Sequence, residues 1–244
     1  MIPASKNGII ELLFAGMNRR MLKRHFHALH LLGRERFEKL DRSLPVIVYG
    51  NHSCWWDGLI EFFLAREVLG MDSFLMMDEQ QMSRYSFFRW IGAFSVNRSS
   101  GRAMITSIEY AANLFDRPNR LLWIYPQGDM QPNDFRPIRF HSGIGSIVDR
   151  LSRVQLMPLA HRYEFLMEQR PEAFVSLGEP ILVTRVEQRK ALLVQLEESL
   201  TRLLNDLRCR IAAGTQREEF DCVLHGQRST NVRYDRFRLK DPPA

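Results

Sequence analysis

Short apolar runs alternate with helix-like segments along most of this chain, and this alternation restricts the possible folds more than any other feature. The strand-like runs are residues 46–49, 73–77, 93–96, 121–125, 155–159 and 173–177. The helix-like segments between them include residues 59–69, 102–115 and 144–151. Short strands that are apolar on both faces and separated by helices are typical of parallel sheets. The pattern predicts an α/β fold, with a mainly parallel central sheet flanked by helices.

A long helix is expected near the C-terminus, from Arg185 to about Ala213. Thr184 and Glu187 have the spacing of a capping box, which satisfies the free backbone N–H groups of a first helical turn. Leucines recur at helical spacing along one face, and Gly214 is suited to end the helix. The last thirty residues are polar and are expected to be loosely ordered.

The N-terminal segment 8–32 has the pattern of a basic amphipathic helix. Apolar residues recur at helical spacing between Ile10 and Met21, and four arginine and lysine residues cluster between Arg19 and Arg24. Such a helix either binds an anionic membrane surface or covers the core. We therefore expect a membrane-docking region in residues 1–40, the main domain in residues 41–214 and a polar tail in residues 215–244.

The charge of the chain favours an anionic partner, because its 244 residues carry a formal net charge of +6. The basic residues are scattered and no nucleic-acid recognition motif is present, so nucleic acid is not expected. The three cysteines have neither disulfide nor metal spacing. No apolar run approaches the roughly 18 to 20 residues that cross a bilayer. We expect a cytoplasmic protein, associated peripherally with the inner face of the membrane.

The stretch "VIVYGNHSCWWDGLIEFF" at residues 46–63 carries the most suggestive chemistry. His52 and Asp57 would lie roughly 140° apart on one continuous helix. If His52 lies in the turn after a strand and Asp57 begins the next helix, the carboxylate can reach the imidazole and leave its other nitrogen as a general base. Alternatively, Asp57 interacts only with the helix N-terminus and His52 is a buried, hydrogen-bonded histidine. Motifs for a serine nucleophile, a metal site or a nucleotide-binding loop are absent.

With these motifs the chain resembles the glycerolipid acyltransferases, the lysophosphatidic-acid acyltransferase-like group. "NHSCWWD" matches the N-H-x4-D signature of that family, and further blocks follow in the family's order. They are "GAFSVNRSSG" at 92–101, "LLWIYPQGDM" at 121–130, "FHSGIGSIV" at 140–148 and "VQLMPLAHRYE" at 154–164.

The resemblance implies transfer of a fatty acyl group from acyl-CoA or acyl carrier protein to a hydroxyl of a lipid acceptor, with no cofactor and no acyl-enzyme. His52 would deprotonate the hydroxyl, and Asp57 would orient its imidazole. Residues at the substrate would be Asn51, Arg98, Gln127, Gly128 and Asp129. Among these, Arg98 would hold an anionic group, and Gly128 would let the backbone approach the substrate.

One block departs from the family pattern, because Glu-Gly-Thr-Arg is replaced by Gln127, Gly128, Asp129 and Met130. Asp129 adds negative charge where a phosphate-bearing acceptor would sit. The acceptor is therefore either lysophosphatidic-acid-like or, by our hypothesis, a neutral hydroxylated or glycosylated lipid. Trp55 and Trp56 either face such a lipid or belong to the core. The rival interpretation is a catalytically inactive acyltransferase-like protein that binds a membrane or an anionic ligand.

Overall fold

One sheet, built from nine strands of the described chain, organises the molecule. The computed structural model describes residues 1–98, 100–227, 230 and 234. The strand order is β4 (Ala93–Val96), β3 (Asp72–Asp78), β5 (Arg120–Ile124), β2 (Val46–Gly50), β6 (Val154–Glu164), β7 (Glu172–Leu177), β1 (Ala28–Leu32) and β9 (Asp221–His225), with β8 (Ile181–Val183) paired to β6. Neighbours from β4 to β6 run parallel, as do β1 and β7, whereas β6 is antiparallel to β7 and β8, and β9 to β1. The predicted α/β fold with a mainly parallel sheet is confirmed.

Helices cover both faces of the central sheet, which explains why its central strands are buried on both faces. In β2, Ile47 and Tyr49 lie in one buried cluster, whereas Val46 and Val48 lie in the other, as the alternation of a strand requires. The first cluster is covered by α5 (Gly101–Asn113), α6 (Gly143–Val148) and α7 (Arg189–Ala213). The second is covered by α2 (Arg34–Glu38), α3 (Asp57–Phe63) and the π-helical turn η1 (Leu64–Leu69).

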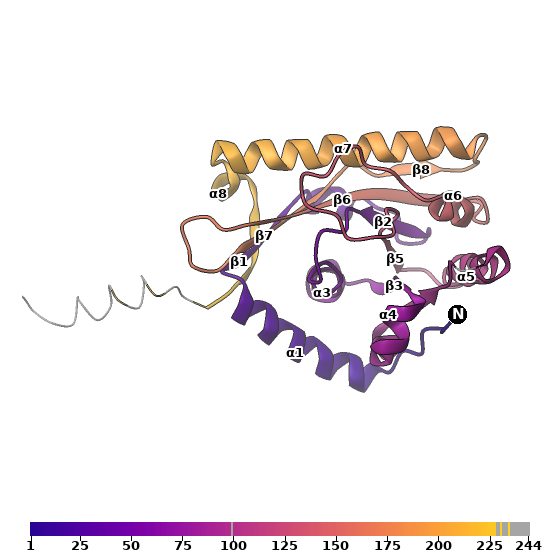
Figure 1. Ribbon diagram of the computed structural model, residues 1–244, viewed down its shortest axis with the longest axis horizontal. Helices are drawn as coiled ribbons and strands as arrows, with labels where there is room; N and C mark the ends of the chain where they lie inside the picture. The colour runs from indigo at the N-terminus through magenta and orange to yellow at the C-terminus, as the bar shows by residue number, and fades with distance from the viewer. Residues whose placement is uncertain (99, 228–229, 231–233, 235–244) are drawn as a thin grey trace, which may run out of the picture.

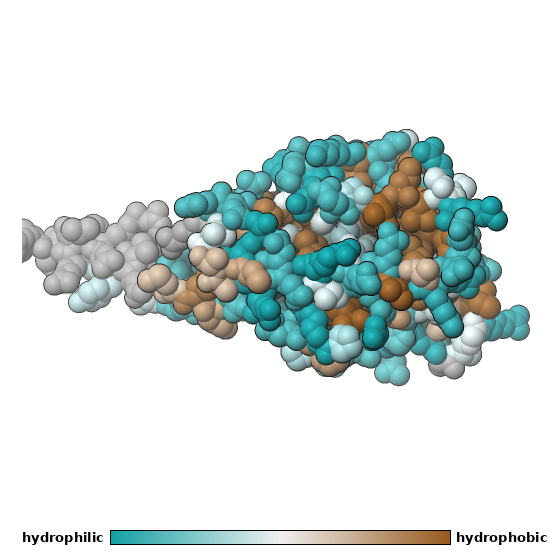
Figure 2. Space-filling model, turned by 90° about the horizontal axis from the view of Figure 1, so that it is seen from above, coloured by the Kyte–Doolittle hydropathy of each residue, from teal (hydrophilic) through white to brown (hydrophobic). Residues whose placement is uncertain are grey.

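The remaining helices lie at the periphery. Helix α1 (Gly8–His25) packs on α3 and on the 3-10 helix η2 (Ser86–Ile91), which follows α4 (Glu79–Arg84), while the short α8 (Gln216–Glu219) follows α7. Figure 1 shows α7 along one side of the molecule and α1 along the other. Hydrophilic side chains cover most of the surface on the α7 side (Figure 2). None of the helices in the described part of the chain is both long and apolar enough to span a bilayer.

The prediction of one helix over residues 8–32 was wrong beyond His25. Helix α1 begins at Gly8, where the Asn7 side chain accepts hydrogen bonds from the N–H groups of Ile9 and Ile10, and it ends at His25. Residues 28–32 instead form β1, which is paired with β7 and β9. A five-residue apolar run has no helical periodicity of its own, so pairing with two strands decides its structure.

The predicted start of the long helix was also wrong by a few residues. Helix α7 begins at Arg189, and its cap residue Gln188 makes no side-chain capping bond. Strand β8 runs to Val183, so residues 184–188 serve to connect the sheet to the helix layer and the expected capping box does not form. The leucine face and the end at Gly214 are as predicted, because the buried positions of α7 include Leu196, Leu200 and Leu207.

Strands from all three predicted segments join the one sheet. β1 comes from residues 1–40 and β9 from residues 215–244, and the two pair with each other at its edge. Half of the predicted loosely ordered tail, at residues 228–229, 231–233 and 235–244, lies outside the described residues.

Candidate active site

The turn after β2 brings His52 and Asp57 together. β2 ends at Gly50, and Asp57 is the first residue of α3, so the chain reverses between them. The Nδ1 atom of His52 lies 2.7 Å from Oδ2 of Asp57. This bond fixes the imidazole tautomer with its proton on Nδ1 and leaves Nε2 as the proton-accepting nitrogen. The predicted contact through a turn, which a continuous helix would forbid, is therefore present.

The Asp57 carboxylate is fully buried and held by several donors. The backbone N–H groups of Ser53 and Cys54 donate to its Oδ2 over 2.7 and 3.1 Å, and the Tyr163 hydroxyl donates to its Oδ1 over 2.5 Å. Burial alone raises the pKa of Asp57, but the imidazoles of His161 and His52 and the Tyr163 hydroxyl outweigh it and hold the pKa below its ordinary value. The group is therefore a carboxylate, suited to stabilise a positive charge on His52.

Of the residues inside the turn, Cys54 is poorly suited to act as a nucleophile. Burial and the neighbouring Asp57 carboxylate raise the pKa of the Cys54 thiol to about 12, which disfavours a reactive thiolate. Trp56 packs in the core against Phe26, whereas Trp55 is about half exposed and lines the cavity beside His52. Trp56 therefore belongs to the core, whereas Trp55 is placed where it could contact a ligand in the cavity.

A second buried layer supports the histidine ring. The Tyr125 ring stacks on the His52 imidazole, with 4.2 Å between centroids and 5° between planes, and its hydroxyl donates to Oε2 of Glu61 over 2.6 Å. His161 is buried beside them, with its Nε2 atom 3.9 Å from Oε1 of Glu61. Burial raises the pKa of Glu61 well above its ordinary range and lowers the pKa of His161. Both shifts favour the uncharged form of the group, and the layer supports the His52 ring by stacking and hydrogen bonding.

The loop after β5 holds the backbone of His52 from both sides. The His52 N–H donates to Oε1 of Gln127 over 3.2 Å, and the N–H of Gln131 donates to the His52 carbonyl over 2.7 Å. A glutamine at this position supplies the same acceptor oxygen that a glutamate would. Gly128 between them has a φ of +81°, a conformation that glycine adopts without strain.

The other predicted substrate residues fall into two groups. The amide of Asn51 is occupied within the fold, because it bonds the backbone of His161 and the hydroxyl of Ser53. Arg98 and Asp129 instead line the cavity that contains His52, and their side chains lie 3.4 Å apart. Among the described residues, no group of three or more His, Cys, Asp and Glu side chains is arranged to hold a metal ion.

Comparison with known proteins identifies the family. A family model described as "Acyltransferase" matches residues 33–162, which is more than half of the chain. The chain belongs to the acyltransferase family. It is 22% identical, over 149 residues, to a 1-acyl-sn-glycerol-3-phosphate acyltransferase from Streptococcus pneumoniae, a match that covers 58% of this chain and about half, 52%, of that relative.

The fold of this acyltransferase is shared with a solved structure. The 1-acyl-sn-glycerophosphate (LPA) acyltransferase PlsC from Thermotoga maritima superposes with a TM-score of 0.55 at 16% identity, over 83% of this chain and 80% of that one. Four of the five motif stretches noted in the sequence lie wholly within residues 33–162, the region of the family match, and the fifth, 154–164, overlaps its end.

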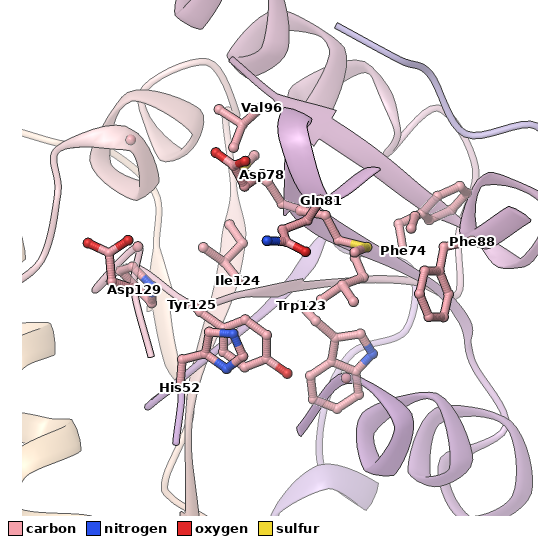
Figure 3. A pocket seen from close by; sticks show the side chains of 18 of the residues that line it. His52, Phe74, Asp78, Gln81, Phe88, Val96, Trp123, Ile124, Tyr125 and Asp129 are labelled. Carbon is pink, nitrogen blue, oxygen red and sulfur yellow. The ribbon is translucent and has the colours of Figure 1, made fainter. Parts of the chain in front are cut away.

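A cavity of about 720 Å³ opens beside His52 in this acyltransferase. Figure 3 shows apolar side chains at one end, among them Phe74 and Phe88, and carboxylates of Asp78 and Asp129 at the other. The cavity is large enough for a lipid-sized ligand and has separate polar and apolar ends. His52 lies along its wall, where it can meet a group bound between the two ends.

Four supporting residues were not assigned roles from the sequence: Glu61, Tyr125, His161 and Tyr163. Glu61 follows Asp57 by one helical turn, and this spacing could have suggested a shared face. The contact between Tyr163 and Asp57 joins residues 106 apart in the chain, so only the pairing of β2 with β6 brings them together. Tyr125 lies within the motif block at 121–130, yet nothing in the sequence indicates that it stacks on His52.

Proposed function

We propose that this acyltransferase moves a fatty acyl group from acyl-CoA or acyl carrier protein to a hydroxyl of a lipid, with His52 as the general base and Asp57 as its orienting partner. The observation that carries the proposal is the 2.7 Å contact between His52 and the fully buried carboxylate of Asp57. The stacked Tyr125 ring and the bonds to Gln127 and Gln131 support it, because they hold the imidazole at the cavity wall.

In the proposed reaction, Nε2 of His52 takes the proton of the acceptor hydroxyl as its oxygen attacks the thioester carbonyl. A carbon–oxygen bond forms, the carbon–sulfur bond breaks, and the proton passes from the imidazolium to the departing thiolate. Asp57 stabilises the imidazolium between these steps. No acyl-enzyme forms, since the acceptor oxygen is the nucleophile and the raised pKa of Cys54 keeps the adjacent thiol protonated.

The acceptor hydroxyl belongs to one of two lipid classes in this proposal. The Streptococcus pneumoniae relative is named for transfer to 1-acyl-sn-glycerol-3-phosphate, which favours a lysophosphatidic-acid-like acceptor. The charge of Asp129 beside Arg98 favours a neutral hydroxylated or glycosylated lipid.

Helix α1 is the proposed membrane contact, on the cytoplasmic side. One face packs through Phe14 and Ala15 on α3 and η2, so the helix does cover part of the core. The opposite face exposes apolar side chains in its first half and basic ones in its second, namely Ile9, Leu12, Leu13, Met17, Arg20 and Arg24. An exposed apolar and basic face fits an anionic lipid surface, close to where lipid acceptors reside.

The test is release of CoA from acyl-CoA in the presence of a lipid extract, with the acylated product identified by mass spectrometry. His52→Ala is expected to lower kcat by roughly a thousandfold, within the usual contribution of a general base. The matched control is His225→Ala, which removes an exposed imidazole on β9 and should leave kcat unchanged. CoA release that is insensitive to His52→Ala would reject the catalytic role and favour an inactive, acyltransferase-like binding protein.

A further inference from the structure

The polar end of the cavity contains one guanidinium and two carboxylates. Nη2 of Arg98 lies 3.4 Å from Oδ1 of Asp129 and 3.7 Å from Oδ2 of Asp78. Among the described residues that line the cavity, Arg98 is the only arginine or lysine. These three side chains together carry a charge of −1, although the whole chain carries +6.

Asp78 is held beside Arg98 because it also caps a helix. It ends β3 and caps α4, where its Oδ1 accepts a hydrogen bond from the N–H of Gln80 over 2.9 Å. The same carboxylate therefore presents its other oxygen, Oδ2, to Arg98. Because the cap fixes its side chain, Asp78 stays beside the guanidinium when a ligand enters.

Asp129 is held near Arg98 by the backbone before it. At Gly128, a Cβ atom would lie 2.6 Å from Nη1 of Arg98 and 2.8 Å from Cδ2 of His141, so the loop passes directly against both side chains. Arg102 and Arg139 are not part of the cavity lining, and Arg139 pairs with Glu197 over 3.1 Å.

A phosphate monoester carries about −1.5 to −2 charges at neutral pH, so it requires a cation that is not already neutralised. Here, binding next to Arg98 would bring the phosphate within reach of two carboxylates. Hydroxyl groups have no such conflict, because they donate to carboxylates and accept from a guanidinium. The neutral amides of Gln80 and Gln81, which also line the cavity, can bond hydroxyls in the same way.

We propose that the polar end of the cavity selects an acceptor with an uncharged, polyhydroxylated headgroup, such as a glycosylated lipid, over one with a phosphate monoester. This inference rests on the proposed acyl transfer at His52. Asp78 and Asp129 are its specificity-determining residues, and the half-exposed indole of Trp55, which lines the same cavity, offers an apolar face to a sugar ring.

The experiment compares two acceptors with the same acyl chain, 1-oleoylglycerol-3-phosphate and 1-oleoyl-3-glucosylglycerol, using one acyl-CoA donor. The ratio of their kcat/KM values is measured for the wild type and for Asp78→Asn/Asp129→Asn. Asparagine keeps the shape of both side chains and still caps α4. The control, Asp116→Asn/Asp149→Asn, neutralises two aspartates that pair with Arg120 and Arg189 away from the cavity.

The wild type is expected to prefer the glucosyl acceptor, and the cavity double variant to shift the ratio toward the phosphate acceptor by about tenfold, as two partly exposed charges allow. The control should leave the ratio unchanged. A wild-type preference for the phosphate acceptor, or an unchanged ratio in the cavity variant, would overturn this inference while leaving acyl transfer intact. Absence of transfer to both acceptors would instead overturn the proposed function, and this inference with it.

Discussion

At the scale of single residues, Gly128 shows how tightly the cavity loop is built. Its φ of +81° disfavours any side chain, and a Cβ would collide with Arg98 and His141. We expect Gly128→Ala to lower the free energy of unfolding by about 1–2 kcal/mol from the backbone conformation alone. Chemical denaturation measures this loss.

The matched control for this substitution is Gly16→Ala. Gly16 lies within α1, where a Cβ would meet no atom within 4 Å, so alanine should raise stability by roughly 0.5–1 kcal/mol. Equal effects of the two substitutions would contradict the assigned conformation of the loop.

At the scale of elements, the outer face of α1 carries the proposed membrane contact. Replacing Leu12 and Leu13 by serine removes two exposed apolar side chains, 63% and 69% accessible, without touching the core face. We expect about a tenfold loss of binding to vesicles that contain anionic lipid. Vesicle sedimentation measures the loss, and the stability of the variant should match the wild type.

The control for α1 is Leu182→Ser/Val194→Ser, which alters two equally apolar, exposed side chains on β8 and α7. It should bind vesicles as the wild type does. If both double variants lose binding to the same extent, the membrane contact is not specific to α1.

The elements also show what the sequence could and could not predict. Strand–helix alternation correctly predicted the sheet and six of its strands, because each carries a continuous apolar signal. β1, β8 and β9 were missed, since their short runs are paired at or near the sheet edges by partners distant in the chain. The end of α1 and the start of α7 were misplaced for the same reason. The residues next to these helix ends pair into strands β1 and β8, which the sequence pattern did not reveal.

In the candidate site, too, some contacts could be predicted from the sequence and others could not. The contact between His52 and Asp57 could be predicted, because the short connection between β2 and α3, residues 51–56, sets it locally. The Arg98 environment could not, because Asp78 is twenty residues away and reaches the cavity only through the pairing of β3 with β4. The spacing of residues in the sequence therefore predicts contacts within one turn, whereas the charges placed around Arg98 depend on which strands pair in the sheet.

At the scale of the whole molecule, the buried Glu61 makes stability depend on pH. Its pKa is raised by burial, so the folded state keeps a proton that the unfolded chain releases above its ordinary pKa of about 4.3. This contribution is complete below that pH and is lost as the pH rises toward the folded pKa. One such proton changes the free energy of unfolding by about 1.4 kcal/mol per pH unit.

Glu61→Gln keeps the shape and removes the proton, so we expect a higher melting temperature than that of the wild type at pH 8 and a smaller difference at pH 5. Glu198→Gln, an exposed site on α7, serves as the control and should show no such trend. A pH-independent difference for Glu61→Gln would show that the carboxyl is ionised in the folded protein.

The central claim, that Asp57 orients His52 for acyl transfer, is tested most directly by the kcat of Asp57→Asn. Asparagine keeps the size of the side chain but cannot stabilise an imidazolium or enforce its tautomer. The account predicts a loss of kcat of at least roughly a hundredfold, with an unchanged KM for the acyl donor and an unchanged fold by circular dichroism. A folded Asp57→Asn variant with a kcat close to that of the wild type would contradict it.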